Sequence, residues 1–291
     1  MGPVTHVFVS PHPDDIALSC GGLVASLRER GERVVIVTLF CGAGSSPALT
    51  DYQRNALGFG DGAGAGGAAG AGGAAGATPS PDEAMARRRA EDELFARSIG
   101  AQIVSLELPE AVFRGYEGEP ELMGTPRPDD PPPVEAVARE LGLLKPRHVY
   151  FPLGVGNHVD HQLTRLAGIA LLGGPHGEPV GSVAVGPGLL GRLLFYEDFP
   201  YAGRTGFERL DQLPRDALAA MPHDVSLAPE YCELGDLLER KIEGIRAYAS
   251  QIDALFGSDG AMSDAVRSRA ARVGQLGGVG PAERYWRAIT S

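Results

Sequence analysis

The sequence predicts an α/β fold of three layers, in which helices cover both faces of a mostly parallel sheet. Two observations point to this fold. Short apolar segments alternate along the chain with longer segments of helical periodicity. In addition, residues 33–40 (RVVIVTLF) are apolar almost throughout, as is typical of a strand buried on both faces of a parallel sheet. With 291 residues, the chain can form one large domain of this kind or two small ones.

The predicted strands are short, rich in β-branched or aromatic residues, and bounded by residues that end extended structure. They are residues 6–10, 33–40, 103–108, 148–153 and 193–197. The predicted helices lie between and after these strands. They are residues 16–30, 81–98, 133–144, 161–172 and 234–254. In the first of them the apolar residues fall on one face, and Gly31 marks the end.

Residues 58–77 (GFGDGAGAGGAAGAGGAAGA) depart from this pattern because they are almost all Gly and Ala. Such a segment cannot bury enough apolar surface to offset the entropy lost on ordering, so we expect a flexible surface loop. A phosphate-binding loop is the alternative, but it requires a strand directly before it. Residues 51–57 are polar and poor in strand-forming residues, which favours the flexible loop.

The composition argues against several classes of function. Asp and Glu outnumber Lys and Arg by 37 to 26, so the formal net charge is −11, and we expect neither nucleic acid nor an anionic membrane as the main partner. The three cysteines are odd in number and far apart, unlike a disulfide framework or a zinc knuckle. The N-terminus lacks a signal-peptide pattern, and no apolar run reaches the roughly 18 residues of a membrane span. We therefore expect a cytoplasmic protein without a membrane span.

A cluster of polar residues occupies the first turn from strand to helix, residues 10–22 (SPHPDDIALSCGG), which holds His12, Asp14 and Asp15. One interpretation is helix capping, which explains a single aspartate at a helix start. It does not explain two adjacent aspartates that repel each other beside a histidine. Imidazole nitrogen and carboxylate oxygen form a zinc-type ligand set, and a bound dication removes the repulsion. The pattern favours metal binding over capping.

A second cluster follows the fourth predicted strand, in residues 154–165 (GVGNHVDHQLTR), where His158, Asp160 and His161 lie within four residues. Taken alone, these can be polar loop residues with Asp160 as a helix cap. Parallel strands, however, bring their carboxyl ends to one edge of the sheet, so both clusters can converge there. Together they offer three ligands for one metal and leave carboxylates over, which is the layout of a catalytic zinc site.

These residues resemble a known family. HPDD followed by an apolar helix with CGG, and later HVDH, is similar to the PIG-L or LmbE-like family of metal-dependent N-deacetylases. The resemblance extends to RRAE at residues 88–91, LPEAVFRG at 108–115 and KIEGIRAYASQ at 241–251. Because it spans roughly the whole chain, it implies one domain over residues 1–291. That domain would be a Rossmann-like three-layer sandwich with its active site at the C-terminal edge of the strands.

The resemblance implies a metal centre with a base beside it. His12, Asp15 and His161 match the family's zinc ligands. Asp14 matches its general base, which takes a proton from the attacking water and then protonates the leaving amine. Zn2+ is the implied cofactor, with Fe2+ or another divalent metal as the alternatives.

Other matches concern the transition state and the substrate. His158 matches the residue that stabilises the tetrahedral oxyanion, and Asp160 matches one that orients a histidine. Arg88 matches a substrate-contacting arginine, and Glu110 stands where an acidic substrate contact is usual, here as Glu rather than Asp. The sequence departs from the family at Ile16, where most members carry Glu in HPDDE. That Glu is not a ligand in the family pattern, so its loss leaves the site intact.

The implied activity is that of a zinc-dependent deacetylase. It would remove the N-acetyl group from an N-acetylglucosamine-type sugar or glycoconjugate, its small-molecule partner, and release acetate and a free amine. The alternatives are an amidase acting on a larger conjugate or another N-acyl group, and a non-catalytic ligand-binding protein on the same fold. Residues 196–201 (YEDFPY) either line the same crevice or pack as aromatic residues at a strand end. The sequence does not indicate an oligomeric state.

Overall fold

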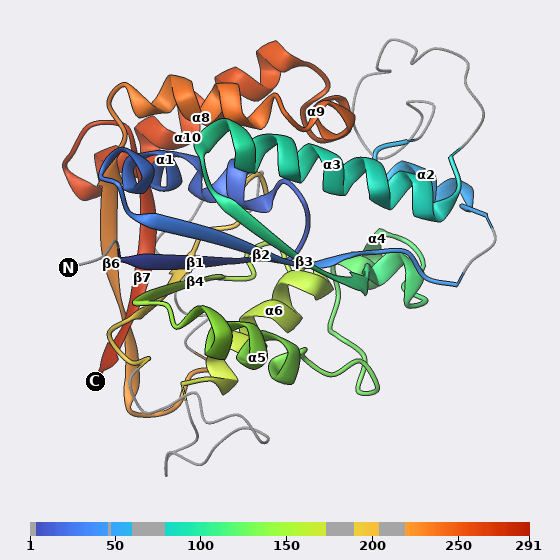
Figure 1. Cartoon of the computed structure of the whole chain (residues 1–291), viewed down its shortest axis with the longest axis horizontal. Coiled ribbons are helices and arrows are strands. Elements are labelled where there is room, and N and C mark those ends of the chain that lie inside the picture. Colours follow the sequence, from blue (N-terminus) through green and yellow to red (C-terminus); the bar gives the residue numbers. More distant parts are fainter. Residues whose placement is uncertain (1–3, 46–47, 60–78, 173–188, 204–218) are drawn as a thin grey trace.

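A seven-stranded sheet forms the centre of the protein (Figure 1). The computed structural model describes residues 4–45, 48–59, 79–172, 189–203 and 219–291. The strand order is β3-β2-β1-β4-β5-β7-β6, and the first five strands in this order run parallel. The parallel strands are β1 (Thr5–Ser10), β2 (Arg33–Gly42), β3 (Gln102–Pro109), β4 (His148–Pro152) and β5 (Leu193–Tyr196).

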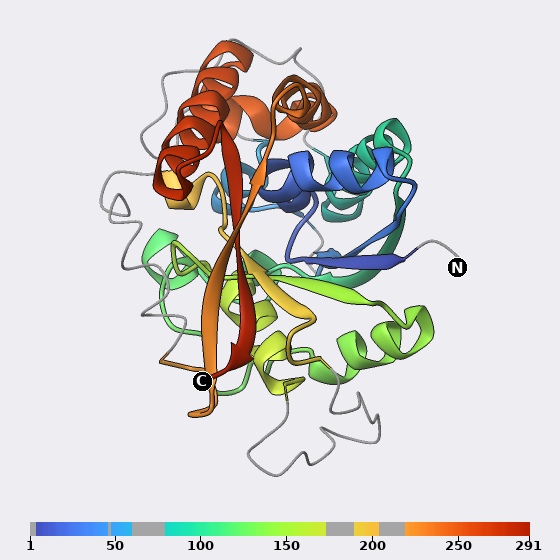
Figure 2. The same ribbon diagram turned by 90° about the vertical axis from the view of Figure 1, so that its left-hand side faces the viewer.

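Two antiparallel strands complete the sheet beyond β5. They are β6 (Val225–Glu233) and β7 (Ala282–Thr290). Figure 2 shows them as a long ribbon at the edge of the sheet opposite β3. The sequence analysis did not predict either strand. The C-terminal residues form β7, which pairs with β5 on one side and with β6 on the other.

Helices cover both faces of the sheet, so the predicted three-layer α/β fold is confirmed (Figure 1). One layer contains α1 (Asp15–Glu29), α3 (Pro81–Ile99), α8 (Leu237–Ile245), α9 (Ala249–Phe256) and α10 (Asp259–Gly277). The other contains α5 (Val134–Leu144) and α6 (Val159–Ala170). Shorter helices are α2 (Asp51–Ala56), α4 (Glu119–Leu122) and the 3-10 turns η1 (Ala111–Phe113) and η2 (Tyr201–Gly203). Each face of the sheet has its own apolar core.

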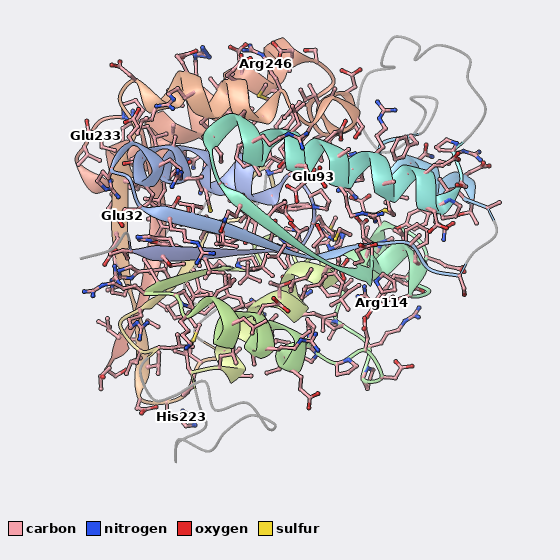
Figure 3. The ribbon with its side chains drawn as sticks, viewed as in Figure 1. Glu32, Glu93, Arg114, His223, Glu233 and Arg246 are labelled. Atoms are coloured by element: carbon pink, nitrogen blue, oxygen red, sulfur yellow. The ribbon has the colours of Figure 1, made fainter. Side chains whose placement is uncertain are left out.

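The strand order determines where a ligand can bind. The chain leaves β1 to build β2 and β3 on one side, and later returns to build β4 on the other side. The loops that follow β1 and β4 therefore diverge at a topological switch point, where open α/β sheets bind ligands. Figure 3 shows which end this is, because Arg114, which follows β3, and Glu32, which precedes β2, lie at opposite ends of the sheet.

The predicted helix over residues 234–254 is wrong as a single helix. It is divided into α8 and α9, with a break at residues 246–248. The cause is a contact with α3: Glu91 accepts hydrogen bonds from the backbone N (2.9 Å) and the hydroxyl (2.6 Å) of Ser250. This carboxylate caps the first turn of α9 from a distant part of the sequence. At the break, Tyr248 turns inward and its hydroxyl reaches Asp92.

The described part of the chain leaves two sequence-based expectations open. The Gly/Ala-rich segment predicted as a flexible loop lies, from residue 60 onward, outside the described residues. The prediction of one domain over residues 1–291 stays a prediction. Within the described ranges, no helix combines the length and the apolar character that crossing a bilayer requires.

Asp92 provides a test of how α3 is buried against α9 and β2. It accepts hydrogen bonds from the hydroxyls of Tyr248 (2.6 Å) and Thr38 (2.7 Å). Burial raises its pKa from 3.8 to about 6, although these hydrogen bonds oppose the shift. The folded protein therefore binds a proton more tightly than the unfolded chain, so this group's stabilisation is full below its unfolded pKa and is lost as the pH rises through about 6.

We expect wild-type protein to lose stability relative to Asp92→Asn between about pH 4 and pH 7, by up to about 3 kcal/mol, and the difference to level off above that range. Urea unfolding of both proteins across the range measures it. Asp253→Asn, on the exposed face of α9, is the matched control and should track the wild type. A difference between wild type and Asp92→Asn that does not vary with pH would contradict the prediction.

Candidate active site and metal centre

The structure brings the two polar clusters of the sequence together at the C-terminal ends of β1 and β4. The ring of His12 lies 4.8 Å from that of His158 and 5.2 Å from that of His161, measured between centroids. All three rings are buried. Residues 146 or more positions apart in the sequence thus share one site, as the parallel arrangement of the strands predicts.

Three ligand atoms in this site are spaced for a cation. Asp15 Oδ2 lies 3.4 Å from His12 Nδ1 and 3.4 Å from His161 Nε2. Ligand atoms at the usual zinc distance in a tetrahedron are separated by about 3.3 Å. His161 Nε2 is also a buried nitrogen without a hydrogen-bond partner among the described residues. Imidazole nitrogens and a carboxylate oxygen suit a divalent cation, which would satisfy that nitrogen.

The remaining ring nitrogens of the two histidines face carboxylates. His12 Nε2 lies 2.9 Å from Asp160 Oδ2, and His161 Nδ1 lies 2.6 Å from Asp198 Oδ1. A carboxylate only accepts hydrogen bonds, so each ring donates from this nitrogen. In the neutral ring the other nitrogen then carries a lone pair, directed toward the position of the cation. Carboxylate partners of this kind accompany most metal-binding histidines.

The charges in the site are strongly coupled. Burial lowers the pKa of His12, but hydrogen bonds to Asp15 and Asp160 outweigh burial and raise it to about 10. Burial raises the pKa of Asp15, but the neighbouring His161 and His12 outweigh it and lower that pKa to about 2. Without a cation, a proton on His12 therefore neutralises Asp15. Cation binding at Nδ1 must displace this proton, so it releases acid.

His158 offers a second way to complete a ligand set. Nitrogens of His12, His158 and His161 lie within 4.8 Å of one another, so a three-histidine site is also open geometrically. His158, however, is the N-cap of α6, and its Nδ1 accepts a hydrogen bond from the backbone N of Asp160 at 3.2 Å. Burial and the nearby His12 lower the pKa of His158. The neutral ring therefore carries its proton on Nε2 and is available as a donor.

Asp14 does not cap the helix that follows it, so the capping interpretation is wrong for this residue. It occupies the N-cap position of α1 but makes no side-chain capping bond. Its backbone φ is 99°, a conformation that L residues rarely adopt and that costs about 1–3 kcal/mol. Burial and the charge of Asp15 raise the pKa of Asp14. The turn thus places the carboxyl group of Asp14, which binds a proton more tightly than usual, on a strained backbone next to Asp15.

Arg88 and Glu110, the two predicted substrate contacts, lie beside Asp14. They form a buried ion pair with each other. Arg88 Nη2 lies 3.7 Å from Asp14 Oδ2 and donates to the carbonyl of Pro13 at 3.3 Å. The Nε of Arg88 is buried without a partner among the described residues. A polar ligand that reaches Asp14 therefore meets a donor and an acceptor of hydrogen bonds.

The segment after β5 is divided between the site and the core. Asp198 contacts His161, and the ring of Tyr201 lies 5.3 Å from that of His161. Tyr196 instead donates to the carbonyl of Val9 at 2.9 Å. The side chain of Glu197 contacts β7 and α10. The two interpretations of residues 196–201 therefore each hold for part of the segment.

Sequence reasoning missed Arg114 as a member of the site, and it placed Asp198 only within residues 196–201 as a possible lining of the crevice. For Asp198 there was a signal, an acidic residue directly beyond a strand on the ligand edge of the sheet. Arg114 gave no such signal, because its contact with Asp160 depends on how the loop after β3 folds back over α6. Its position in the site comes only from the three-dimensional structure.

Comparison with known proteins identifies relatives that cover most of the chain. A family model described as PIG-L: GlcNAc-PI de-N-acetylase matches residues 7–172. A 2'-N-acetylparomamine deacetylase of Streptomyces fradiae is 32% identical over 252 residues, which cover 85% of this chain and 73% of that protein. A protein of the same name from Niallia circulans is 28% identical over 212 residues, covering 67% of this chain and 66% of the relative.

A solved structure shares the fold along its full length. The zinc-inhibited form of the teicoplanin deacetylase Orf2 has a TM-score of 0.71 at 19% sequence identity, with 99% of each chain covered. At this identity the likeness concerns the fold alone. The family match and the Streptomyces relative carry the assignment further, and they confirm the resemblance that HPDD and HVDH indicate. This chain belongs to the PIG-L family of de-N-acetylases.

Proposed function

We propose that this protein is a metal-dependent hydrolase that removes the N-acetyl group from an N-acetylglucosamine-type amino sugar or its conjugate. One observation carries the proposal: His12 Nδ1, Asp15 Oδ2 and the unpartnered His161 Nε2 converge beside Asp14, a buried acid with a strained backbone. The relatives named as 2'-N-acetylparomamine deacetylases support an amino sugar as the substrate class.

For the metal we assign His12, Asp15 and His161 in preference to the three-histidine set. The distances of 3.4 Å from Asp15 Oδ2 to both histidines fit a tetrahedral site, and His158 already uses Nδ1 as a helix cap. Zinc is the proposed cation, and Fe2+ or another divalent metal is the alternative for the same donors. When bound, such a cation polarises the amide carbonyl and acidifies a water molecule.

The other residues have separate roles in proton transfer, in stabilising negative charge and in orienting a ligand. Asp14 accepts a proton from the attacking water and returns it to the leaving amine, and its raised pKa makes it a stronger base. His158 donates from Nε2 to the oxygen that gains negative charge. Asp160 holds the ring of His12 through Nε2.

Arg88 and Glu110 bind the substrate in this proposal. Their ion pair borders Asp14, so an amino sugar with its acetamide at Asp14 would exchange hydrogen bonds with both side chains. An amidase that takes a larger conjugate or another N-acyl group would use the same centre. A binding protein without catalysis gives no reason for the strained position of Asp14.

Acetate release tests the function directly. We expect the zinc-loaded protein to release acetate from 2'-N-acetylparomamine or N-acetylglucosamine, chelation to abolish the release, and added Zn2+ to restore it. Release from glycopeptide conjugates alone would favour the amidase alternative. Binding of these sugars without any acetate release would favour the non-catalytic protein.

Variants at Asp14 and His161 separate catalysis from metal binding. Asp14→Asn should lower kcat by about 10²–10⁴-fold, because an amide cannot take the proton from the attacking water, while zinc stays bound. His161→Ala should lose the metal together with activity. Metal content and turnover of each purified protein give the answer. Near wild-type turnover of Asp14→Asn would remove the assignment of Asp14 as the base.

Asp198 tests the orientation of His161. It accepts hydrogen bonds from His161 Nδ1 at 2.6 Å and from the backbone N of Val155 at 2.9 Å. We expect Asp198→Asn to weaken zinc binding by about 10–100-fold, because the amide is a weaker acceptor and no longer fixes the ring as firmly. Competition with a chromogenic chelator measures the affinity. Unchanged affinity would show that the ring is held by its packing alone.

A further inference from the structure

Arg114 is a half-buried cation in the loop after β3, at the same end of the sheet as the candidate metal centre (Figure 3). We propose that Arg114 is a positioning residue for this centre: it fixes the carboxylate of Asp160, which in turn holds the ring of His12 with Nδ1 toward the cation. The inference rests on the proposed function for the identity of the metal site, and it extends that function to a residue outside the HPDD and HVDH motifs.

The first step is the contact between Arg114 and Asp160. Arg114 Nη2 donates to Asp160 Oδ1 at 2.6 Å. The other oxygen, Oδ2, accepts from His12 Nε2 at 2.9 Å and from the backbone N of Ala111 at 3.0 Å. Asp160 is completely buried, so its carboxylate depends on these protein partners for its hydrogen bonds. Without Arg114, Oδ1 loses its charge partner and the carboxylate is free to turn away from His12.

The second step is the anchoring of Arg114 itself. Its Nε lies 3.1 Å from each carboxylate oxygen of Asp130, and its Nη2 lies 2.9 Å from Asp130 Oδ2. Its Nη1 donates to the carbonyl of Pro109. The guanidinium also stacks 4.7 Å above the ring of Phe40, at the end of β2. Three nitrogens in a rigid plane therefore reach three different acceptors.

This arrangement requires arginine. A lysine ammonium is a single point of charge on a flexible stem and cannot reach the same acceptors in a fixed geometry. The bidentate contact with Asp130 fixes the plane of the guanidinium, so Nη2 arrives at Asp160 from one direction only. Arg114 thus joins the loop after β3 to Asp160 in α6, so that the position of one fixes the position of the other.

The same loop carries Glu110, the proposed substrate contact, four residues before Arg114. Because Arg114 binds this loop to Asp160, it joins the substrate side of the crevice to the metal side. A change at Arg114 should therefore affect metal affinity first, through His12, and substrate binding less.

Arg127 provides a matched control. It lies in the same segment, stacks 4.6 Å above the ring of Tyr116, and donates to the carbonyls of Gly115 and Arg114 and to Glu121. It therefore orders the same loop, but none of its described contacts involves Asp160. A purely structural role for Arg114 predicts equal effects from Arg114→Ala and Arg127→Ala.

The experiment measures zinc affinity by competition with a chelator, and the exchange with water of the His12 Nε2 proton in the zinc-loaded protein. We expect Arg114→Ala to weaken zinc binding by about 10–100-fold and to speed the exchange of that proton, with added guanidinium restoring part of both. Arg114→Lys should stay impaired. Arg127→Ala should match the wild type in both measurements, and kcat of zinc-saturated Arg114→Ala should fall more than its KM rises.

Several outcomes would overturn the inference. These are wild-type zinc affinity and proton exchange in Arg114→Ala, an equal loss in Arg127→Ala, or a wild-type protein that binds no zinc. If Arg114→Ala does not fold, Arg114→Lys decides, since wild-type affinity in that variant contradicts the need for a planar fork. Neither measurement depends on turnover. A wild-type protein that binds zinc as described but releases no acetate would therefore refute the proposed function and leave this inference standing.

Discussion

The candidate site depends on carboxylates that are buried in contact with imidazoles. Asp15 lies between His12 and His161, while Asp160 and Asp198 hold the far nitrogens of the same two rings. Removing an ionised carboxylate from water costs several kcal/mol unless a partner compensates it. Each acid therefore needs its ring, and each ring is thereby fixed in orientation and in the nitrogen that carries its proton. The lone pairs of His12 Nδ1 and His161 Nε2 are then left on the side of Asp15 Oδ2.

The C-terminal third of the chain supports this site, although it lies beyond the family match over residues 7–172. Glu197 accepts hydrogen bonds from Arg284 Nε (2.6 Å) and Trp286 Nε1 (3.0 Å), both in β7, and pairs with Arg269 of α10. These contacts fix the end of β5, and the next residue is Asp198. Glu197 thus contacts β7 and α10, while the adjacent Asp198 contacts His161. Through these two residues the antiparallel part of the sheet supports the position of His161.

The sequence alone was enough to predict the parallel strands and the motifs that meet at their carboxyl ends. Apolar runs predicted the parallel strands, and the position of HPDD and HVDH after two of them predicted that these motifs meet. What could not be predicted depends on partners far along the chain. The break between α8 and α9 exists because Glu91 caps Ser250 across 159 residues. β7 was not predicted because Glu and Arg interrupt AERYWRAIT without regular alternation, and the segment becomes buried only by pairing with β5 and β6.

The departure from the family at Ile16 has a structural explanation. Ile16 is 1% exposed and packs in the apolar core formed by α1, α8, α9 and α10. Its side chain thus lies in the core, while the preceding Asp14 and Asp15 face the site. A buried glutamate at this position would need a charged partner, whereas isoleucine needs only apolar neighbours, which the core provides. The substitution therefore leaves the turn that carries Asp14 and Asp15 unchanged. Among the described residues, the loop that carries Glu110 and Arg114 contacts both Arg88 and Asp160, and so it borders both sides of the candidate site.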